Sequence, residues 1–390
     1  MSELVLRLNR SWMLVGWITI FLVGTDLFVV SPFLPAIGND LHKLPSSLTM
    51  AVSIFSIVYA IACPIQAKIA EKIGVHKVLL FGVLTISLAN LFTSVASDLT
   101  QLLLSRGLAG LAAASISPML YVLTSERTVP QERAGKLALI NSGLVVALVF
   151  GAPLGLLLGA YSGWRWVFSL LALAFVLMVP VNSVTWLNGA APTKKVAGAS
   201  QERLSEAIIY FVSMICWASC VYAIYTLLST ALNSEHQMNV QAVAMMLTSY
   251  GVGAAIGGVL GGRLADRIGA INMVRLSFLL MALALLLLLV VYPTKMVWAL
   301  SLNLFLLALV AYGFFPALQA CTAMHFFTRR PTVMGLVSSS LYIGITLGSF
   351  VGGKIFTLHG MTGVILFSTL MALAGMVISL FLRKKSVEPR

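Results

Sequence analysis

The sequence predicts an all-α membrane protein in which twelve transmembrane helices form two pseudo-symmetric six-helix bundles. Of its 390 residues, 59% are hydrophobic and only 9% are charged, whereas soluble domains carry about 25% charged residues. Apolar runs of about 20 residues recur along the chain, which is the length that crosses a hydrocarbon layer. Lipid permits only helices or closed barrels, and the alternating ten-residue segments of a barrel are absent. The spans are therefore helical.

The predicted spans follow one another with short connections. Their approximate limits are 12–37, 47–70, 77–97, 100–124, 136–160, 164–187, 205–232, 240–262, 272–292, 296–324, 332–356 and 361–382. The first span is not expected to be a cleaved signal, because it carries no small-residue cleavage pattern and a second span follows closely.

The basic residues predict the orientation of the spans. With the N-terminus in the cytoplasm, twenty of the 25 Lys and Arg residues fall at the inner side. Four lie outside, namely Lys43, Arg165, Lys295 and Lys354, and Arg106 lies within a span. This distribution follows the positive-inside rule. It predicts a cell (inner) membrane protein with both termini cytoplasmic, and it explains the net charge of +13 without a nucleic-acid partner.

No pattern in the sequence predicts an enzyme or a metal protein. The four cysteines, Cys63, Cys216, Cys220 and Cys321, all lie in predicted spans. Cys216 and Cys220 are one helical turn apart, but a metal site requires more ligands nearby. Neither a Walker loop nor a Ser-His-Asp arrangement is present. We therefore expect small core cysteines, no catalytic residues, no metal and no cofactor.

One long polar stretch divides the spans into six and six. It reads NGAAPTKKVAGASQERLS over residues 188–205, a composition typical of a linker. The predicted organisation is an N-terminal bundle over residues 1–187, a cytoplasmic linker over 188–204, and a C-terminal bundle over 205–390.

The two halves also repeat one another. AKIAEKIG over residues 67–74 corresponds to GRLADRIG over 262–269, with Glu71 and Asp266 separated by 195 residues. A weaker echo, at an offset of 197, relates Gly151, Gly155 and Gly163 to Gly348, Gly352 and Gly360. Because repeated halves are typical of carriers that bind substrate at the repeat interface, the duplication predicts a transporter.

The repeated loop motif resembles a signature of the major facilitator superfamily, Gly-x-Leu-Ala-Asp-Arg-x-Gly-Arg-Lys. The first copy departs from it at Ala67, Glu71 and Lys72. The resemblance implies a latch between the cytoplasmic ends of the halves. The residues that carry this implied role are Glu71, Lys72, Gly74, Asp266, Arg267 and Gly269. The alternative is a solvated charged turn that only sets topology.

The fourth span contains a buried basic residue. Arg106 lies about eight residues inside Asp98, which is roughly 12 Å at 1.5 Å per residue. An Arg within a membrane costs about 2.5–3.5 kcal/mol on insertion scales and requires a partner. The surrounding sequence, LLLSRGLAGLAAAS, resembles the fourth-helix motif of the superfamily, in which a buried Arg takes part in proton coupling. The alternative is that Arg106 snorkels to the headgroups.

The fifth span ends in a glycine and proline motif, GAPLGLLLGAYSGWRWVF. Gly151, Pro153 and Gly155 disfavour a regular helix, so we expect a bend or a close helix crossing. The motif resembles the antiporter motif of drug:proton exporters, in the form found among sugar and purine efflux permeases. This resemblance favours export over uptake. The alternative is a role in packing alone. Trp164 and Arg165 are expected to anchor the span at the interface.

The first span carries an acid, Asp26, in the run FLVGTDLFVVSPFLPAI. It lies near mid-membrane at a depth similar to that of Arg106, so the two are candidates for an ion pair. The Thr25-Asp26 pair, followed by Pro35, resembles the first helix of the same exporter subgroup. We predict that Asp26 exchanges a coupling proton, H+, and that Arg106 biases its charge. The alternative is a structural ion pair that never titrates.

Polar and aromatic residues within the spans are candidates for contact with a solute. They are Asn141, Trp217, Tyr222, Tyr225, Tyr250, Phe314, Phe315, Gln319 and Tyr342. Simple helix packing is the alternative for each.

The complete pattern predicts a secondary active transporter that exports a small organic solute or drug by proton antiport through alternating access. The alternatives are proton-coupled uptake, transport of an amphipathic lipid-like substrate, and a transporter-like membrane sensor that carries nothing. The expected partners are the solute, the proton and membrane lipid, and the protein is expected to be a monomer.

Overall fold

The structure is a computed structural model that describes residues 11–129, 132–187, 207–326 and 330–382. These residues form helices and short connections, and eleven of the helices are long and apolar enough to cross a membrane. The chain divides into two compact units, residues 1–195 and 196–390. The predicted linker, 188–204, lies outside the described residues. We describe each unit by itself.

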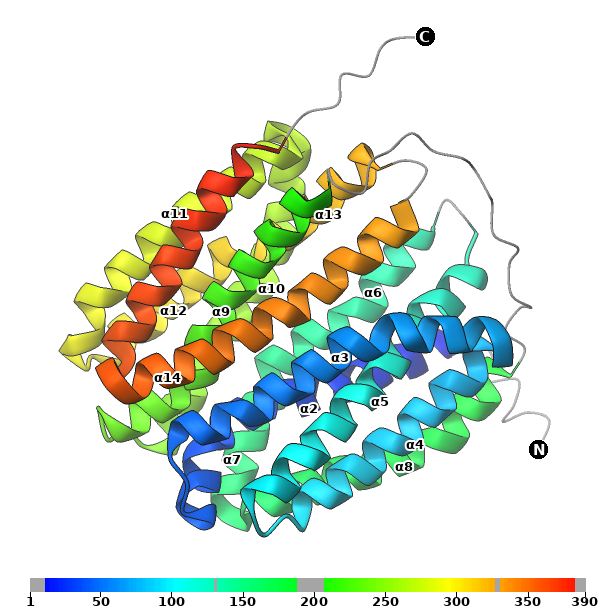
Figure 1. The fold of residues 1–390 in the computed structure, drawn as a ribbon, viewed down its shortest axis with the longest axis horizontal. Coiled ribbons are helices and arrows are strands. Elements are labelled where there is room, and N and C mark those ends of the chain that lie inside the picture. Colours follow the sequence, from blue (N-terminus) through cyan, green and yellow to red (C-terminus); the bar gives the residue numbers. More distant parts are fainter. Residues whose placement is uncertain (1–10, 130–131, 188–206, 327–329, 383–390) are drawn as a thin grey trace. The chain divides into compact units, whose positions relative to one another are not determined.

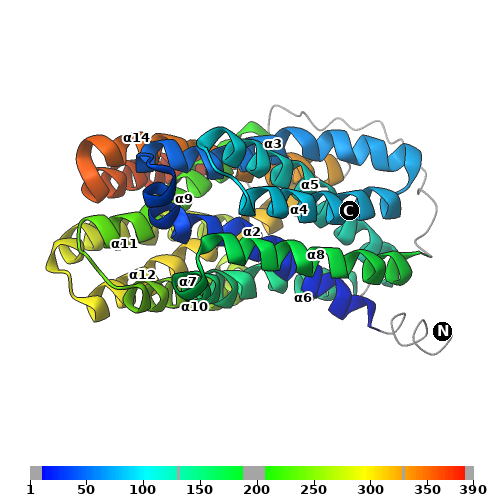
Figure 2. The same cartoon turned by 90° about the horizontal axis from the view of Figure 1, so that it is seen from below.

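The helices of the N-terminal unit run alongside one another (Figures 1 and 2). They are α2 (Trp12–Leu41), α3 (Pro45–Ile73), α4 (Val75–Ser94), α5 (Leu99–Glu126), α6 (Arg133–Val146), η1 (Ala147–Gly151), α7 (Ala152–Ser162) and α8 (Trp164–Trp186). Local sequence sets several of the starts. Pro45 occupies the first helical position of α3, where its missing N–H costs nothing. Asp98 caps α5 by accepting a 2.9 Å hydrogen bond from the backbone N–H of Gln101.

The predicted fifth span is a helix with an irregular middle. Residues Gly135–Ser162 form one membrane-length segment, which contains the π-helical turn η1 between α6 and α7. Pro153 follows directly and has no backbone N–H to donate. The predicted irregularity at Gly151 and Pro153 is thus present as a π-bulge, which is a frequent local cause of a helix kink.

The C-terminal unit repeats this arrangement of long helices. Its elements are α9 (Ile208–Ser234), α10 (Val240–Ile268), α11 (Ala270–Val291), η3 (Tyr292–Thr294), α12 (Val297–Tyr312), α13 (Phe314–His325) and α14 (Arg330–Ser379). The side chain of Asn239 caps α10 by accepting a 2.9 Å hydrogen bond from the N–H of Ala242.

The last two predicted spans, 332–356 and 361–382, belong to a single element, α14. This element is interrupted at Gly360, whose φ of 61° and ψ of −162° are not helical. Only glycine adopts such angles readily. Beyond this residue the chain turns back beside α11 (Figure 1). The structure therefore contains eleven candidate spans instead of twelve separate ones, because α14 holds two predicted spans joined at a glycine.

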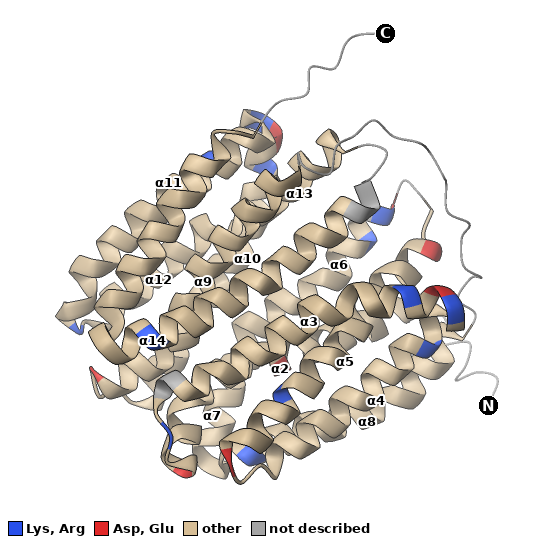
Figure 3. Cartoon of the chain, viewed as in Figure 1, with Lys and Arg blue, Asp and Glu red and all other residues tan. Residues whose placement is uncertain are grey.

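Most charged residues lie near the ends of the helices, and long stretches without charged residues separate them (Figure 3). Many large apolar side chains on the helix surfaces are exposed, including Leu104, Trp166 and Leu358. An apolar exterior combined with polar ends is the pattern that a hydrocarbon environment requires.

Candidate functional site

The centre of the N-terminal unit contains a buried ion pair between α2 and α5. One terminal nitrogen of Arg106 lies 2.8 Å from Oδ1 of Asp26, and the other lies 3.0 Å from Oδ2. Asp26 is 0% exposed and Arg106 is 1% exposed. The second nitrogen is also 3.4 Å from the backbone oxygen of Asp26. This bidentate geometry gives each charge a directly bonded partner.

Aromatic rings surround the guanidinium group. Its central carbon lies 5.1 Å from the ring centroid of Phe55 and 5.8 Å from that of Phe168. Within the described chain, the third guanidinium nitrogen, Nε, has no hydrogen-bond partner. Among the described residues this is also the only ion pair with both side chains buried. A change in the charge of either partner would therefore occur in a low-dielectric environment.

The helix bearing Asp26 packs tightly against the fifth span. A Cβ added at Gly151 would overlap the side chain of Thr25, and one added at Gly155 would overlap Val29. The same holds one turn further along for Gly159 and the ring of Phe33. The antiporter-motif glycines therefore form a close helix crossing beside Asp26, and Pro153 lies within it.

A second acid of α2 connects this helix to the beginning of α8. Asp40 accepts a 3.2 Å hydrogen bond from the indole N–H of Trp164 and forms an ion pair with Arg165. Arg165 also donates a 2.7 Å hydrogen bond to the backbone oxygen of Ala96. The guanidinium group lies 4.3 Å from the indole centroid of Trp164. Sequence reasoning treated Trp164 and Arg165 as interfacial anchors and did not find Asp40.

The C-terminal unit has an equivalent acid, Glu235, which is 195 residues after Asp40. Its Oε1 accepts a 2.9 Å hydrogen bond from the N–H of Met361, and its Oε2 accepts a 2.6 Å bond from the hydroxyl of Tyr292. In both units the acid at the end of the first long helix is thus bonded to the start of the last predicted span of that unit. The offset of 195 residues, which also relates Glu71 to Asp266, was the signal that would have found both acids.

The repeat is also visible in the backbone. Gly74 and Gly269 have nearly the same conformation, with φ of 100° and 91° and ψ of 141° and 140°. Gly163 and Gly360 also have positive φ values, of 85° and 61°. Each of these glycines lies between two long helices, where a residue without a Cβ permits an abrupt turn.

The row formed by Gly151, Gly155 and Gly159 against α2, which we call the glycine seam, also has a counterpart. A Cβ at Gly344 would overlap Ala218 and a Cβ at Gly348 would overlap Ser219, so α14 packs closely on α9. Thr25 with Gly151 corresponds in this way to Ser219 with Gly348, which places Cys220 at the position of Asp26. The buried carboxylate is therefore not repeated there.

The loop-motif side chains lie at the helix ends. Glu71, Lys72, Asp266 and Arg267 are exposed, and Gly74 and Gly269 form the turns described above. These placements define two chemically similar charged turns. Their role as a latch stays a prediction.

Most of the predicted aromatic solute residues meet inside the C-terminal unit. Ring centroids are 6.5 Å apart for Tyr222 and Tyr225, 5.6 Å for Tyr225 and Tyr250, and 6.2 Å for Tyr250 and Tyr312. Tyr312 was not among the predicted residues, although it directly precedes Gly313 and Phe314.

Trp217 joins these tyrosines to a second group of rings. Its centroid is 5.6 Å from that of Tyr312, 5.4 Å from that of Phe314 and 6.2 Å from that of Phe315. Its indole N–H donates a 2.8 Å hydrogen bond to the backbone oxygen of Ala311. Trp217 is 2% exposed and Phe314 is 0% exposed. In this structure both rings pack in the interior of the unit.

The remaining predicted solute residues do not form one group. Asn141 accepts a 2.7 Å hydrogen bond from the hydroxyl of Tyr121 in the N-terminal unit. Gln319 and Tyr342 are half-buried in the C-terminal unit, and the side-chain oxygen of Gln319 has no hydrogen-bond partner among the described residues.

Two units of membrane-length helices, related by an internal repeat and containing a buried ion pair, define a multi-pass membrane protein of the carrier type. The family model of the Major Facilitator Superfamily matches residues 16–230 and 207–390. The chain therefore belongs to this superfamily of transporters, and it is a membrane transporter and not an enzyme.

Similar bacterial proteins support this assignment. The chain is 27% identical over 380 residues to the uncharacterised MFS-type transporter YwfA of Bacillus subtilis, covering 94% of this chain and 90% of the relative. It is 24% identical over 343 residues to the inner membrane transport protein YdhP of Escherichia coli K12, covering 86% of each. It is 28% identical to the putative multidrug resistance protein MdtD of Escherichia coli over 164 residues, covering 41% of this chain and 34% of the relative.

Solved structures with the same fold include a bacterial homologue of the human lysosomal transporter Spinster. In its inward-facing, unoccupied conformation the TM-score is 0.78 at 15% identity, with 97% of this chain and 99% of that chain covered. In its inward-facing, occupied conformation the TM-score is 0.75 at 16% identity, with 96% and 97% covered. At this identity the likeness establishes the fold.

Proposed function

We propose that this transporter exports a small organic solute in exchange for protons. The observation that carries the proposal is the ion pair between Asp26 and Arg106, because both side chains are buried and bonded directly to each other. Intramembrane ionisable residues commonly mark ion pathways and proton relays. The coupling ion in this proposal is H+, and Asp26 is the residue that binds it.

The proposed coupling follows from the cost of an unpaired charge. When Asp26 binds a proton it loses its negative charge, and Arg106 is left buried without a counter-ion. Breaking a buried pair in this way costs about 3–5 kcal/mol. The protonated protein therefore favours an arrangement in which Arg106 reaches water, the solute or another acceptor. Proton binding and the change of access state become linked through Arg106.

The glycine seam gives this change a route to the rest of the N-terminal unit. Asp26 follows Thr25, which lies directly against Gly151. A shift of α2 around the ion pair must therefore move or separate the fifth span, whose π-bulge η1 lies at this contact. The resemblance of Gly151, Pro153 and Gly155 to the antiporter motif favours export, and the partial similarity to MdtD agrees with it.

The proposed solute is neutral or weakly charged and carries an apolar or aromatic group. Aromatic rings, and in the tyrosines hydroxyl groups, are available to such a solute from Tyr222, Tyr225, Tyr250, Phe314 and Phe315. The one buried carboxylate of the described spans is already neutralised by Arg106, so no buried acid is left to bind an organic cation. Uptake by symport and transport of an amphipathic lipid-like substrate use the same residues and differ in the direction or size of the cargo.

We further propose that α14 crosses the membrane twice. A 47-residue segment, Val333–Ser379, would be about 70 Å long as one straight helix, more than twice the thickness of a hydrocarbon layer. The break at Gly360 divides it into two spans of suitable length. Twelve crossings place both termini on the same side, which the basic loops assign to the cytoplasmic face of the inner membrane. The proposed unit of function is the monomer.

Transport in reconstituted vesicles tests the proposal. Solutes are first selected by thermal-shift screening across drugs, sugars and nucleobases. Proteoliposomes loaded with a selected solute then receive a pH gradient of either sign. We expect a gradient that is acidic outside right-side-out vesicles to drive solute efflux, with Asp26→Asn losing this response while retaining solute exchange at equal pH. Asp40→Asn is the matched control, because Asp40 lies on the same helix but is partly exposed.

Three outcomes would contradict the proposal in different ways. If Asp26→Asn retained full gradient-driven efflux, proton-coupled export would still hold, but Asp26 would not be the residue that binds the proton. Inward accumulation of the solute down the proton gradient would support symport. A protein that binds solutes but moves none, in either gradient, would instead support the sensor alternative.

A further inference from the structure

Helices α10 and α12 are held together by a row of glycines that covers only part of their length. A Cβ on Gly253 would overlap the backbone of Phe305, one on Gly257 would overlap that of Leu309, and one on Gly261 would overlap Gly313. These contacts repeat every four residues on both helices and thus define a parallel register. The backbones are as close as helices can come because nothing larger than hydrogen separates them.

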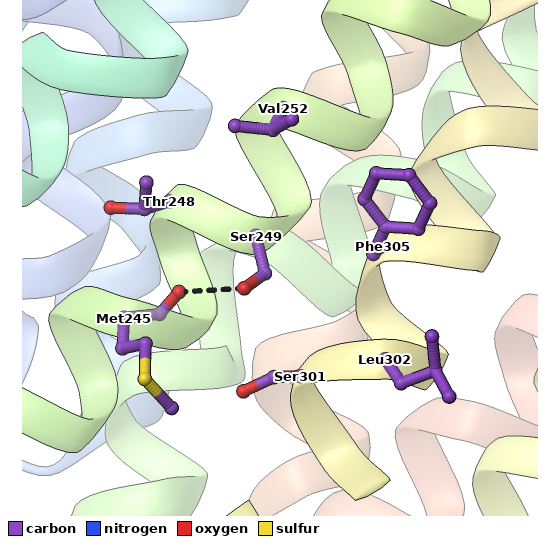
Figure 4. A pocket seen from close by; sticks show the side chains of 7 residues that line it. All are labelled: Met245, Thr248, Ser249, Val252, Ser301, Leu302 and Phe305. Carbon is purple, nitrogen blue, oxygen red and sulfur yellow. Dashed lines mark hydrogen bonds between the residues drawn. The ribbon is translucent and has the colours of Figure 1, made fainter. Parts of the chain in front are cut away.

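The row ends at Gly253, and a cavity opens beyond it. The same register places Ser249 opposite Ser301, and both are larger than glycine. From this point toward the beginnings of α10 and α12 the space between the helices is a groove of about 450 Å³ (Figure 4). Its volume is within the range of roughly 300–1,000 Å³ that is typical of small-molecule sites. We call it the α10–α12 groove.

Apolar side chains form most of the walls. They are Met245 and Val252 from α10 and Leu302 and Phe305 from α12. Met245 is 47% exposed and Leu302 is 53% exposed, so the groove opens at the surface of the unit. Both helices lie in segments that are long and apolar enough to cross a membrane, so the walls of the groove suit a molecule that dissolves in hydrocarbon.

Three hydroxyls also line the groove, and one of them has no partner. Thr248 donates a 2.9 Å hydrogen bond to the oxygen of Ala244, and Ser249 donates a 3.0 Å bond to the oxygen of Met245. Ser301 is 9% exposed, and its Oγ has no hydrogen-bond partner within the described chain. Helical serines usually donate to the carbonyl one turn earlier. Ser301 instead points from α12 toward α10, into the groove (Figure 4).

The position and charge of the groove limit what it can bind. Ser301 lies four residues after the start of α12 at Val297, or roughly 6 Å along the axis. A polar group bound there is close to the helix ends, while an apolar group extends along Val252 and Phe305. None of the lining residues is charged. Because a charge without a counter-ion is costly in an apolar site, the groove selects against ionised groups.

We propose that the α10–α12 groove is a binding site for a neutral single-chain amphiphile from the membrane. The alkyl chain packs on Met245, Val252, Leu302 and Phe305. The hydroxyl or carbonyl group of the amphiphile exchanges a hydrogen bond with Ser301. This site is distinct from the ion pair and does not depend on the direction or existence of proton coupling.

The first half of the chain supplies an internal comparison. At the offset of 195 that relates the loop motifs, Ser249 corresponds to Ile54. At the offset of 198 that relates Pro118 to Pro316, Ser301 corresponds to Leu103. Both hydroxyl positions are thus aliphatic in the N-terminal half. Ser301→Leu is therefore a suitable substitution to block the groove, because leucine occupies the corresponding position of the first half.

Photolabelling tests this site directly. The full chain in lipid nanodiscs is irradiated with a monoacylglycerol that carries a diazirine in its acyl chain, and the labelled peptides are mapped by mass spectrometry. We expect label at the beginnings of α10 and α12. Ser301→Ala should weaken labelling about fivefold, the effect of one lost hydrogen bond, and Ser301→Leu should reduce it at least tenfold. Excess unlabelled monoacylglycerol should abolish it.

The matched control is Ser277→Ala. Ser277 on α11 is also fully buried with an Oγ that has no partner in the described chain, but it does not line the groove, so labelling should not change. Thermal unfolding of each variant verifies folding. Label that maps elsewhere, or that is as strong in Ser301→Ala and Ser301→Leu as in the parent protein, would overturn the proposal. Equal competition by an ionised fatty acid of the same chain length would overturn the neutral class of ligand.

Discussion

Thr25 lies directly against Gly151, and this contact sets the distance between α2 and the fifth span. The hydroxyl of Thr25 donates a 2.9 Å hydrogen bond to the backbone oxygen of Phe21, so its side chain is held in place. Gly151 is the last residue of the π-helical turn η1. The residue before the buried acid is therefore packed against the irregular part of another helix.

Gly151→Ala should destabilise the protein because its new methyl group has no space beside Thr25. Overpacking of this kind typically costs about 1–3 kcal/mol. The measurement is thermal unfolding of the purified variant in detergent. Thr25→Ala should restore much of the loss in the double variant, because it removes the overlapping hydroxyl.

Gly135→Ala is the control for this experiment. Gly135 lies in α6, and a Cβ there meets nothing within 4 Å, so alanine should be neutral or slightly stabilising through its higher helix propensity. Equal effects of Gly135→Ala and Gly151→Ala would show that helix propensity, and not the contact with Thr25, determines the result.

The ion pair should behave as a coupled unit in a double-variant cycle. Arg106→Met leaves Asp26 buried without a partner and should cost about 3–5 kcal/mol of stability. Replacing both residues, as in Asp26→Leu with Arg106→Met, removes both charges and should cost less than the sum of the single changes. Unfolding in denaturant at neutral pH measures each corner of the cycle. Additive losses would contradict a direct interaction.

Gly360→Ala should be more harmful than an ordinary glycine replacement. Its backbone angles are strained for alanine, at a cost of about 1–3 kcal/mol, and a Cβ would lie 2.7 Å from Oε1 of Glu235. Gly335→Ala is the matched control on the same element, since its Cβ would meet nothing within 4 Å. Thermal unfolding should separate the two variants. A regular helix across position 360 would make them equivalent.

His236 should make stability depend on pH below neutrality. Burial and the positive charge of Lys295 lower the pKa of His236, and Glu235 opposes this shift only in part. The unfolded chain then binds a proton more readily than the folded one, so stability is present above pH 6.5, the ordinary pKa of His, and is lost as pH falls below it.

His236→Phe keeps the ring contact with Tyr292, whose centroid is 4.3 Å away, but cannot titrate. Its unfolding temperature should fall less than that of the parent protein between pH 7 and pH 5. His359→Phe, at an exposed position of α14, should follow the parent protein. A parallel fall in all three proteins would exclude His236 as the cause.

Much of the architecture was predictable because a membrane imposes length, polarity and periodicity on the sequence. The positions of the spans and the depth match of Asp26 and Arg106 follow from these constraints alone. The last two predicted spans, 332–356 and 361–382, meet at Gly360, which turns the chain without a polar loop, so the single element α14 contains both of them. The twelve predicted spans therefore appear as eleven candidate membrane spans in the part of the chain that the structure describes.

Contacts between distant residues were harder to predict. Asp40 and Glu235 look like ordinary loop acids, and only their separation by the repeat distance distinguishes them. Ser301 gave no signal either, because a serine in a helix normally bonds its own backbone. Trp217 and Phe314 were chosen for their chemistry, but the chemistry of an aromatic ring does not reveal whether it faces a solute or another ring.

The pairing of Asp26 with Arg106 also has an electrical consequence. A carboxylate and a guanidinium held together have no net charge, so the membrane potential does almost no work when they move as a unit. When Asp26 binds a proton, the pair carries the single positive charge of Arg106. Moving one elementary charge across the full membrane changes the free energy by about 2.3 kcal/mol per 100 mV. The voltage dependence of the change in access state therefore reports whether this pair carries a proton.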